Sequence, residues 1–330
     1  MNRSWVERLP AFLRTKIEHR YSLQGILANT GWLMVDNVFR MVLGVLVGAW
    51  VARYLGPEQF GELAYVLAFV ALFQAASKLG LDSIVIRDMA RDADSAPAIL
   101  GTVLRLRLIT GLVCWAAAIG GMALLRPGDA TALLLVAIIA GTVIFQAIDT
   151  IDLWFQSCTQ SRRTVIAKTS ALLGVSLIRV VLILAKAPLV AFAGMMLIET
   201  VLVALALVWM YRHYPAPAAW IWQVGRARQL LWESWPFLLS GIAVLIYIRI
   251  DQLMLFDMVS EHELGIYSAA LPLSTAWYFV PVAICASVAP ALARKKDRSE
   301  AEYMTALECL FSLMWWYTLP LCIVIALLSE

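Results

Sequence analysis

The sequence predicts an all-α protein that crosses a membrane several times, and three observations support this fold class. Of the 330 residues, 62% are hydrophobic and only 15% are charged, and the mean hydropathy is +0.80. Apolar runs of about 20 residues, long enough for a helix to cross a bilayer, recur along the chain. Proline, glycine and charged clusters separate these runs. A soluble protein of this length has too little core for so much apolar surface.

Nine membrane spans are predicted, at residues 28–55, 60–80, 100–125, 131–156, 163–185, 189–211, 230–256, 264–292 and 303–328. A basic cytoplasmic segment, residues 1–27, precedes them. A Trp- and Arg-rich interfacial linker, residues 212–229, follows the sixth span. We therefore expect an N-lobe of six helices at 28–211 and three helices of a second lobe at 230–330.

The distribution of basic residues predicts how the chain is oriented. Lysines and arginines concentrate in the N-terminal segment and in every second connection between spans. The other connections contain only Arg53, Arg126 and Lys186. Because cytoplasmic connections of membrane proteins are enriched in Lys and Arg, we expect the N-terminus in the cytoplasm. This assignment leaves three basic residues, all inside spans: Arg40, Arg179 and Arg249.

An internal repeat relates the two predicted lobes. Phe60-Gly61, between the first two spans, matches Leu264-Gly265, between the seventh and eighth, at an offset of 204 residues (60 to 264). At the same offset, the third span falls on the ninth. Six spans separate the copies, so both have the same orientation, as in parallel repeats around an axis normal to the membrane. Substrate paths in such proteins lie between the lobes.

Ionisable residues inside the spans are the candidate functional residues, because a charge in the bilayer is costly. Asp36 and Arg40 form an i, i+4 pair, and Arg40 lies near the bilayer midplane. Arg179 and Arg249 lie at similar depths in the fifth and seventh spans, and Asp251 points to a different face from Arg249. The planar fork of arginine suits phosphate oxygens. These five residues are candidates for a cavity that binds a phosphate-bearing ligand.

These residues also have interpretations that need no ligand. Asp36 and Arg40 can neutralise each other as an internal ion pair. Arg179 can extend its guanidinium to the outer headgroups. In the same first span, Gly44 and Gly48 form a small-xxx-small motif, which favours the close approach of a neighbouring helix.

Three carboxylates inside the spans form a second group of candidates. Asp149 and Asp152 lie one turn apart near the cytoplasmic end of the fourth span, and Glu199 lies near the middle of the sixth. Carboxylates of this kind bind a coupling proton or Na⁺, or they neutralise arginines of neighbouring helices. We expect no other cofactor.

The sequence argues against several other classes of protein. P-loop, GxSxG, HExxH and dinucleotide-binding motifs do not occur, and the connections between spans are too short for a catalytic domain. The five cysteines form no CxxC pair or Cys/His cluster, which argues against a metal or disulfide role. The net charge of +3 is spread along the chain and provides no basic surface for nucleic acid. We therefore expect a membrane protein that is not an enzyme and holds no metal.

Several phrases of the sequence resemble one known family. They are residues 51–61 (VARYLGPEQFG), 79–87 (LGLDSIVIR), 233–241 (ESWPFLLSG), 247–252 (YIRIDQ) and 265–270 (GIYSAA). These phrases, together with the spacing of Trp32, Asp36 and Arg40, are similar to the polysaccharide-biosynthesis (O-antigen type) flippases. Those flippases belong to the multidrug/oligosaccharidyl-lipid/polysaccharide exporter superfamily. The resemblance covers essentially the whole chain.

The resemblance implies a transporter of two six-helix lobes. It would move a polyprenyl-diphosphate-linked glycan, such as an O-antigen, capsule or exopolysaccharide repeat unit, across the bacterial inner membrane. In such flippases a cationic cavity receives the diphosphate, and Arg40 and Arg249 are the positions that match it. Membrane lipids, polysaccharide polymerases and assembly proteins are further candidate partners. Members often have Glu at the position of Asp36. They also have at least twelve spans, whereas nine are predicted here, so either this chain is a fragment or its second lobe is incomplete, and we expect no transport by this chain alone.

Alternative functions stay open at this point. A cation-coupled drug exporter of the same superfamily favours an acidic and aromatic cavity, and three membrane arginines argue against it. A membrane glycan ligase or polymerase needs a large external loop with catalytic residues, and the external connections here are short. A non-transporting scaffold is the third alternative. The preferred interpretation is a flippase that works by alternating access between its lobes.

Overall fold

The computed structural model describes residues 11–158, 160–214, 220–278 and 299–328, together with the single residues 281, 284 and 292. These residues belong to two compact units, Met1–Ala270 and Leu271–Glu330. Every regular element in the described part of the chain is a helix, which confirms the predicted all-α class.

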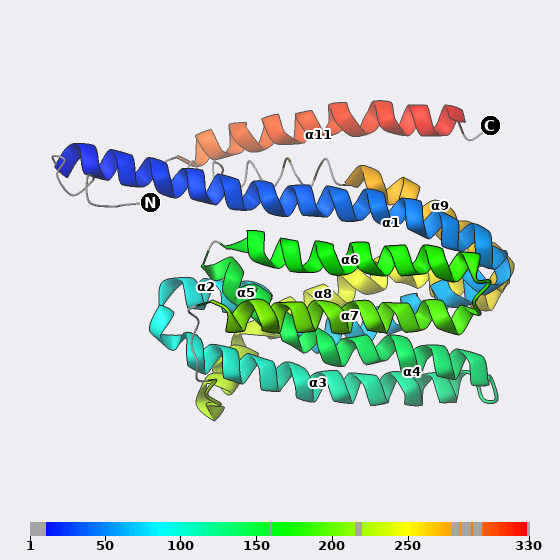
Figure 1. Cartoon of the computed structure of the whole chain (residues 1–330). Coiled ribbons are helices and arrows are strands. Elements are labelled where there is room, and N and C mark those ends of the chain that lie inside the picture. The colour runs from blue at the N-terminus through cyan, green and yellow to red at the C-terminus, as the bar shows by residue number, and fades with distance from the viewer. Residues whose placement is uncertain are drawn as a thin grey trace. The chain divides into compact units, whose positions relative to one another are not determined.

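The first helix, α1 (Ala11–Lys78), contains the first two predicted spans and turns sharply between them (Figure 1). Gly56 has φ 75° and ψ 170°, which is not a helical conformation, and Pro57 follows it. Glycine adopts positive φ without steric cost, and a residue before proline avoids the helical region. The boundary predicted between the first two spans is therefore confirmed.

The remaining helices of the first unit follow in short succession. Pro97 in the first turn of α3 suits a helix start, and Asp129 caps α4 by accepting a hydrogen bond from the backbone N–H of Ala132 at 2.9 Å. Pro188 directly precedes α7. The elements are α2 (Asp82–Arg91), η2 (Ala93–Ser95), α3 (Ala96–Leu125), α4 (Ala130–Phe145), η3 (Gln146–Asp149), α5 (Thr150–Ser157), α6 (Ser161–Leu184), α7 (Leu189–Arg212), α8 (Val224–Met258) and α9 (Glu261–Thr275).

Two further elements belong to the second unit: η4 (Ala276–Tyr278) and α11 (Glu300–Leu328). α11 coincides with the predicted ninth span. The predicted eighth span begins in α9, and most of its second half lies outside the described residues.

Six stretches of the described residues are long and apolar enough to cross a membrane, so the protein is a multi-pass membrane protein. The first stretch contains most of the first predicted span and all of the second, and the other five match the third to the seventh. The stretches are Asn37–Arg91, Ala96–Leu125, Ala130–Ser157, Ser161–Leu184, Leu189–Arg212 and Val224–Met258.

Within the first unit, successive long helices run in opposite directions, so alternate connections lie at the same end (Figure 1). α2 lies at one end, and the turns that join α3 to α4 and α6 to α7 lie at the other. α3 packs on α4, α6 packs on α7, and α1 contacts α4, α6 and α8. This alternation gathers the connections rich in Lys and Arg at the α2 end, as the sequence predicts.

The core of the first unit consists of two apolar clusters. The first contains Val66, Leu135 and Ile139, and the second contains Leu81 and Phe155. Each cluster joins residues from several helices that lie far apart in the sequence. Along α3, the buried arginine Arg107 stands between Val103 of the second cluster and Ala118 of the first. A buried charge therefore lies between the two clusters along α3.

The two copies of the internal repeat contact each other reciprocally. A Cβ atom added to Gly61 would lie 1.9 Å from the carbonyl oxygen of Glu261, and one added to Gly265 would lie 1.9 Å from that of Pro57. At the offset of 204 residues (57 to 261), Pro57 corresponds to Glu261 and Gly61 to Gly265. The two contacts are thus equivalent, as in a two-fold symmetric interface. This packing supports the predicted repeat.

Candidate functional site

Arg249 lies in α8, inside a membrane-crossing stretch, and no carboxylate of the described residues is paired with it. Its Nη1 donates to Oε1 of Gln252 at 2.9 Å, while its buried Nε has no hydrogen-bond partner. Gln252 in turn donates to Oγ of Ser268 on α9 at 3.3 Å. An uncompensated guanidinium inside a membrane is costly. The site therefore favours an anion beside Arg249.

Asp251, the candidate two residues further on, makes contacts of a different kind. Its carboxylate accepts a hydrogen bond from the backbone N–H of Gln252 at 2.8 Å and another from the hydroxyl of Tyr267 on α9. The two-residue spacing points Asp251 away from Arg249, as the sequence predicts. Asp251 thus joins α8 to α9 and leaves the charge of Arg249 uncompensated.

Arg40 is half-buried in the first part of α1. The side chain of Asp36 lies outside the described residues, so the predicted ion pair with Arg40 stays a prediction.

Arg179 and Glu199 form an ion pair between α6 and α7. Nη2 of Arg179 lies 2.8 Å from Oε2 of Glu199, and the two side chains are only 16% and 23% exposed. The sequence left open whether Glu199 binds a coupling ion or neutralises an arginine, and in this structure it contacts Arg179. The charge of Arg179 is thereby compensated, in contrast to that of Arg249.

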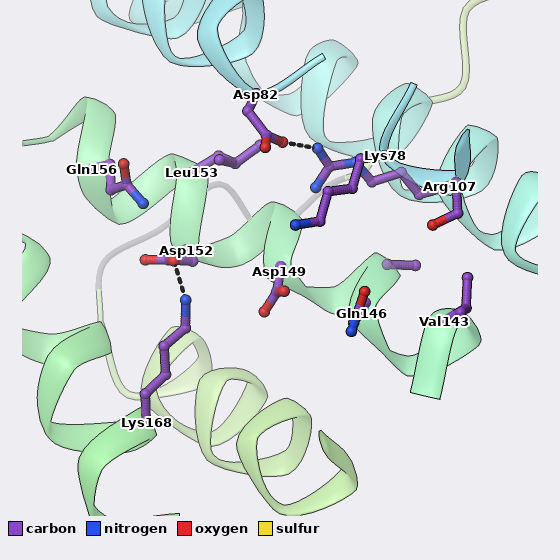
Figure 2. A pocket seen from close by; sticks show the side chains of 12 residues that line it. Lys78, Asp82, Arg107, Val143, Gln146, Asp149, Asp152, Leu153, Gln156 and Lys168 are labelled. Carbon is purple, nitrogen blue, oxygen red and sulfur yellow. Dashed lines mark hydrogen bonds and ion pairs between the residues drawn. The ribbon is translucent and has the colours of Figure 1, made fainter. Parts of the chain in front are cut away.

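The largest group of ionisable residues surrounds a polar cavity of about 170 Å³ at the α2 end of the bundle (Figure 2). Three basic and three acidic side chains line it, from five helices and the 3₁₀ segment η3. They are Lys78, Asp82, Arg107, Asp149, Asp152 and Lys168, and the other lining residues are Ser77, Val143, Gln146, Ala147, Leu153 and Gln156.

Two ion pairs connect opposite walls of this polar cavity. Arg107 on α3 pairs with Asp82 on α2, and Lys168 on α6 pairs with Asp152 on α5 (Figure 2). The side chains of Arg107 and Asp152 are 5% and 10% exposed, so each pair contains one deeply buried charge. Such a charge is tolerated only with a partner.

The roles of Arg107, Lys168 and Lys78 are not evident from the sequence, because all three lie close to the basic connections that orient the chain. Arg107 is the twelfth residue of α3, about 16 Å from the helix start, and is buried. Lys168 lies in the second turn of α6. A signal was present in the sequence, since Arg107 falls inside the predicted span 100–125.

The small-xxx-small motif of α1 lines an open groove. No atom lies within 4 Å of a Cβ placed on Gly44 or Gly48. Both glycines border an apolar groove of about 240 Å³ between α1, α6 and α7, whose wall includes Ser176 and Arg179. The motif permits the close approach of a helix, but no helix among the described residues lies against the two glycines, which face the groove.

A charged network also links α2 to the start of α8. Nη2 of Arg87 lies 2.8 Å from Oε2 of Glu233, and Nη2 of Arg226 lies 2.8 Å from Oδ2 of Asp88. Gln229 donates to Glu233 at 3.0 Å and completes the network. These contacts hold the first helix of the second repeat copy against the first copy at the α2 end.

The helices and the membrane-embedded charges define a multi-pass helical membrane protein. Residues 26–296 match the sequence model of the family described as polysaccharide biosynthesis protein, and the chain belongs to this family. The match confirms the resemblance noted in the sequence. Searches of curated proteins and of solved structures found no significant match. The family is one of transporters, which is consistent with the lack of enzyme motifs, and it implies a lipid-linked glycan substrate in general terms.

Proposed function

We propose that this protein acts as a flippase that translocates a polyprenyl-diphosphate-linked oligosaccharide across the bacterial inner membrane by alternating access. One observation carries the proposal: Arg249 stands in a membrane helix with a buried Nε that has no hydrogen-bond partner and with no paired carboxylate among the described residues. An anionic group of the substrate would accept a hydrogen bond from Nε of Arg249 and neutralise the charge of its guanidinium group.

We propose Arg40 as the second cation of this site. Arg40 lies on the first half of α1 and Arg249 on α8, helices of different repeat copies. At the offset of 204 residues (45 to 249), Arg249 corresponds to position 45, five residues beyond Arg40. Five residues span about 7.5 Å along a helix, so Arg249 lies about 7.5 Å further along its span than Arg40 does along its own. Two guanidinium groups suit a diphosphate better than one.

The remaining parts of the proposal follow from the bilayer. The polyprenyl chain would stay in the lipid while the diphosphate and glycan pass between the lobes. The basic α2 end would face the cytoplasm. Asp36 and Asp251 would accompany the arginines in the cavity, and Arg179, when released from Glu199, would extend the cationic surface. The reciprocal contact of Gly61 and Gly265 provides the two-fold related interface that rocking lobes require.

Export of the glycan tests this proposal in cells that carry the full gene. We expect Arg40→Ala and Arg249→Ala each to lower export at least tenfold, because an uncompensated diphosphate is left in the membrane. Arg249→Lys should recover only part of the loss, since lysine lacks the bidentate fork. Arg91→Gln, a change of an exposed arginine on α2, is the matched control. Normal export by both alanine variants at equal protein levels would contradict the proposal.

A further inference from the structure

Asp149 and Lys78 stand apart from the other charges in the polar cavity. The remaining four charged lining residues form the pairs Arg107–Asp82 and Lys168–Asp152. Neither Asp149 nor Lys78 makes a hydrogen bond or an ion pair with another described side chain. Figure 2 shows Lys78 extending toward Asp149, while Lys168 points to Asp152. The cavity thus contains one carboxylate that is close to cations but bonded to none.

The backbone around Asp149 departs from the α-helix. The 3₁₀ segment η3 (Gln146–Asp149) interrupts the membrane-crossing stretch between α4 and α5. In a 3₁₀ helix, residues three apart lie above one another, so Gln146 and Asp149 share a face. Val143 and Asp152, three residues before and after this pair, also line the cavity. Breaks of this kind in membrane helices are typical of ion-binding positions in transporters.

Unsatisfied polar atoms show that the polar cavity is built to hold something polar. Nε of Arg107, Oε1 of Gln146 and Oδ1 of Asp152 are buried and lack a hydrogen-bond partner among the described residues. Arg107 and Asp152 as whole residues are only 4% and 7% exposed. A volume of about 170 Å³ holds several water molecules, which such atoms require. The cavity therefore supplies both the acid and a hydrated path to it.

We infer that Asp149 is a proton-binding site, reached through the water of the polar cavity. A proton needs only the carboxylate of Asp149, whereas a metal cation needs several ligand groups arranged around it. No group of three or more His, Cys, Asp or Glu side chains arranged to hold a metal ion occurs in the described part of the chain.

The charges that face Asp149 come from nearly every element around it. α1 contributes Lys78, α2 contributes Asp82 and α3 contributes Arg107, while α5 and α6 contribute Asp152 and Lys168. α4 and α7 contribute no charged side chain to the lining. With Asp149 ionised, three positive and three negative charges balance. When Asp149 takes up a proton, the cavity gains a net charge of one positive unit.

This change in charge connects the polar cavity to the substrate. A proton on Asp149 adds one positive charge to the polar cavity, which favours the binding of an anionic headgroup nearby. By linkage, the anion favours the proton to the same extent. This coupling role rests on the proposed function, whereas proton binding itself does not.

Labelling with dicyclohexylcarbodiimide tests proton binding in the purified chain without any glycan, because this reagent adds to carboxyl groups in their protonated form. We expect a label on Asp149, located by peptide mass spectrometry. The label should fall about tenfold per pH unit once the pH exceeds the half-labelling value. Lys78→Met should move the labelling curve to higher pH, since a nearby cation favours the ionised carboxylate. Arg91→Gln, outside the cavity, should leave the curve unchanged.

Three outcomes would overturn the inference. In the first, Asp149 is not labelled at any pH. In the second, Lys78→Met does not move the labelling curve. In the third, labelling is weaker in NaCl than in choline chloride at the same pH and ionic strength. The last outcome would assign the site to Na⁺. Failure of glycan export in the Arg249→Ala experiment has no bearing on this labelling, so the two proposals fail separately.

Discussion

Gly61→Ala is expected to destabilise the protein by about 1–3 kcal/mol, the usual cost of inserting an atom where no room exists. The new Cβ would lie 1.9 Å from the carbonyl oxygen of Glu261, which belongs to the backbone and cannot rotate away. Relief requires α1 and α9 to separate, and this separation breaks the reciprocal contact at Gly265 as well. The midpoint of thermal unfolding in detergent, followed by circular dichroism, measures the effect.

Gly48→Ala is the matched control for this prediction. It introduces the same atom into the same helix, but nothing lies within 4 Å of its position. Alanine favours helix over glycine by about 1 kcal/mol, so this variant should be as stable as the parent or more stable. Equal unfolding midpoints for Gly61→Ala and Gly48→Ala would show that the two repeat copies do not touch at Gly61.

Lys168→Met is expected to cost about 3–5 kcal/mol, because it leaves the buried carboxylate of Asp152 without its cation. The Asp152 side chain is only 10% exposed, and its Oδ1 already lacks a partner. Adding Asp152→Asn to Lys168→Met removes the unpaired charge and should recover most of the loss. The four proteins of this double-mutant cycle are compared by their unfolding midpoints at neutral pH.

The neighbouring pair Arg107–Asp82 supplies the contrast. Arg107→Met leaves the carboxylate of Asp82, which is 49% exposed and stays solvated, so the loss should be smaller than for Lys168→Met. Asp82→Asn instead strands the Arg107 guanidinium, which is 5% exposed, and should cost more than Arg107→Met. Equal destabilisation by Lys168→Met, Arg107→Met and Asp82→Asn would mean that burial does not control how much these ion pairs contribute to stability.

Much of the fold was predictable from the sequence, because a bilayer demands long apolar helices and allows few alternatives. The helix boundaries at Gly56-Pro57, at Asp129 and at Pro188 coincide with residues whose backbone preferences act locally. The repeat was also detectable, since the glycine that permits the contact of one copy recurs in the other.

The partners of the charged residues were not predictable in the same way. A sequence shows that Arg107 or Arg179 lies in a span, but the neighbouring carboxylate belongs to a helix distant in the chain. Arg179 pairs with Glu199 across α6 and α7, while Arg249 keeps no carboxylate partner among the described residues. Arg179 and Arg249 lie at similar depths in their spans, so their depth did not reveal that their surroundings differ. The groove beside Gly44 was not predictable for a similar reason, since a small residue in a helix can either allow a close helix contact or leave an open groove.

Binding of a polyprenyl diphosphate to the purified protein tests the central claim, that Arg249 holds the anionic headgroup, most directly. Affinity is measured for the diphosphate, for the uncharged polyprenol and for an organic cation, in the parent and in Arg249→Ala. We predict that the parent prefers the diphosphate and that Arg249→Ala weakens this affinity at least tenfold, about 1.4 kcal/mol. Equal affinity in both proteins, or a preference for the organic cation, would contradict the account.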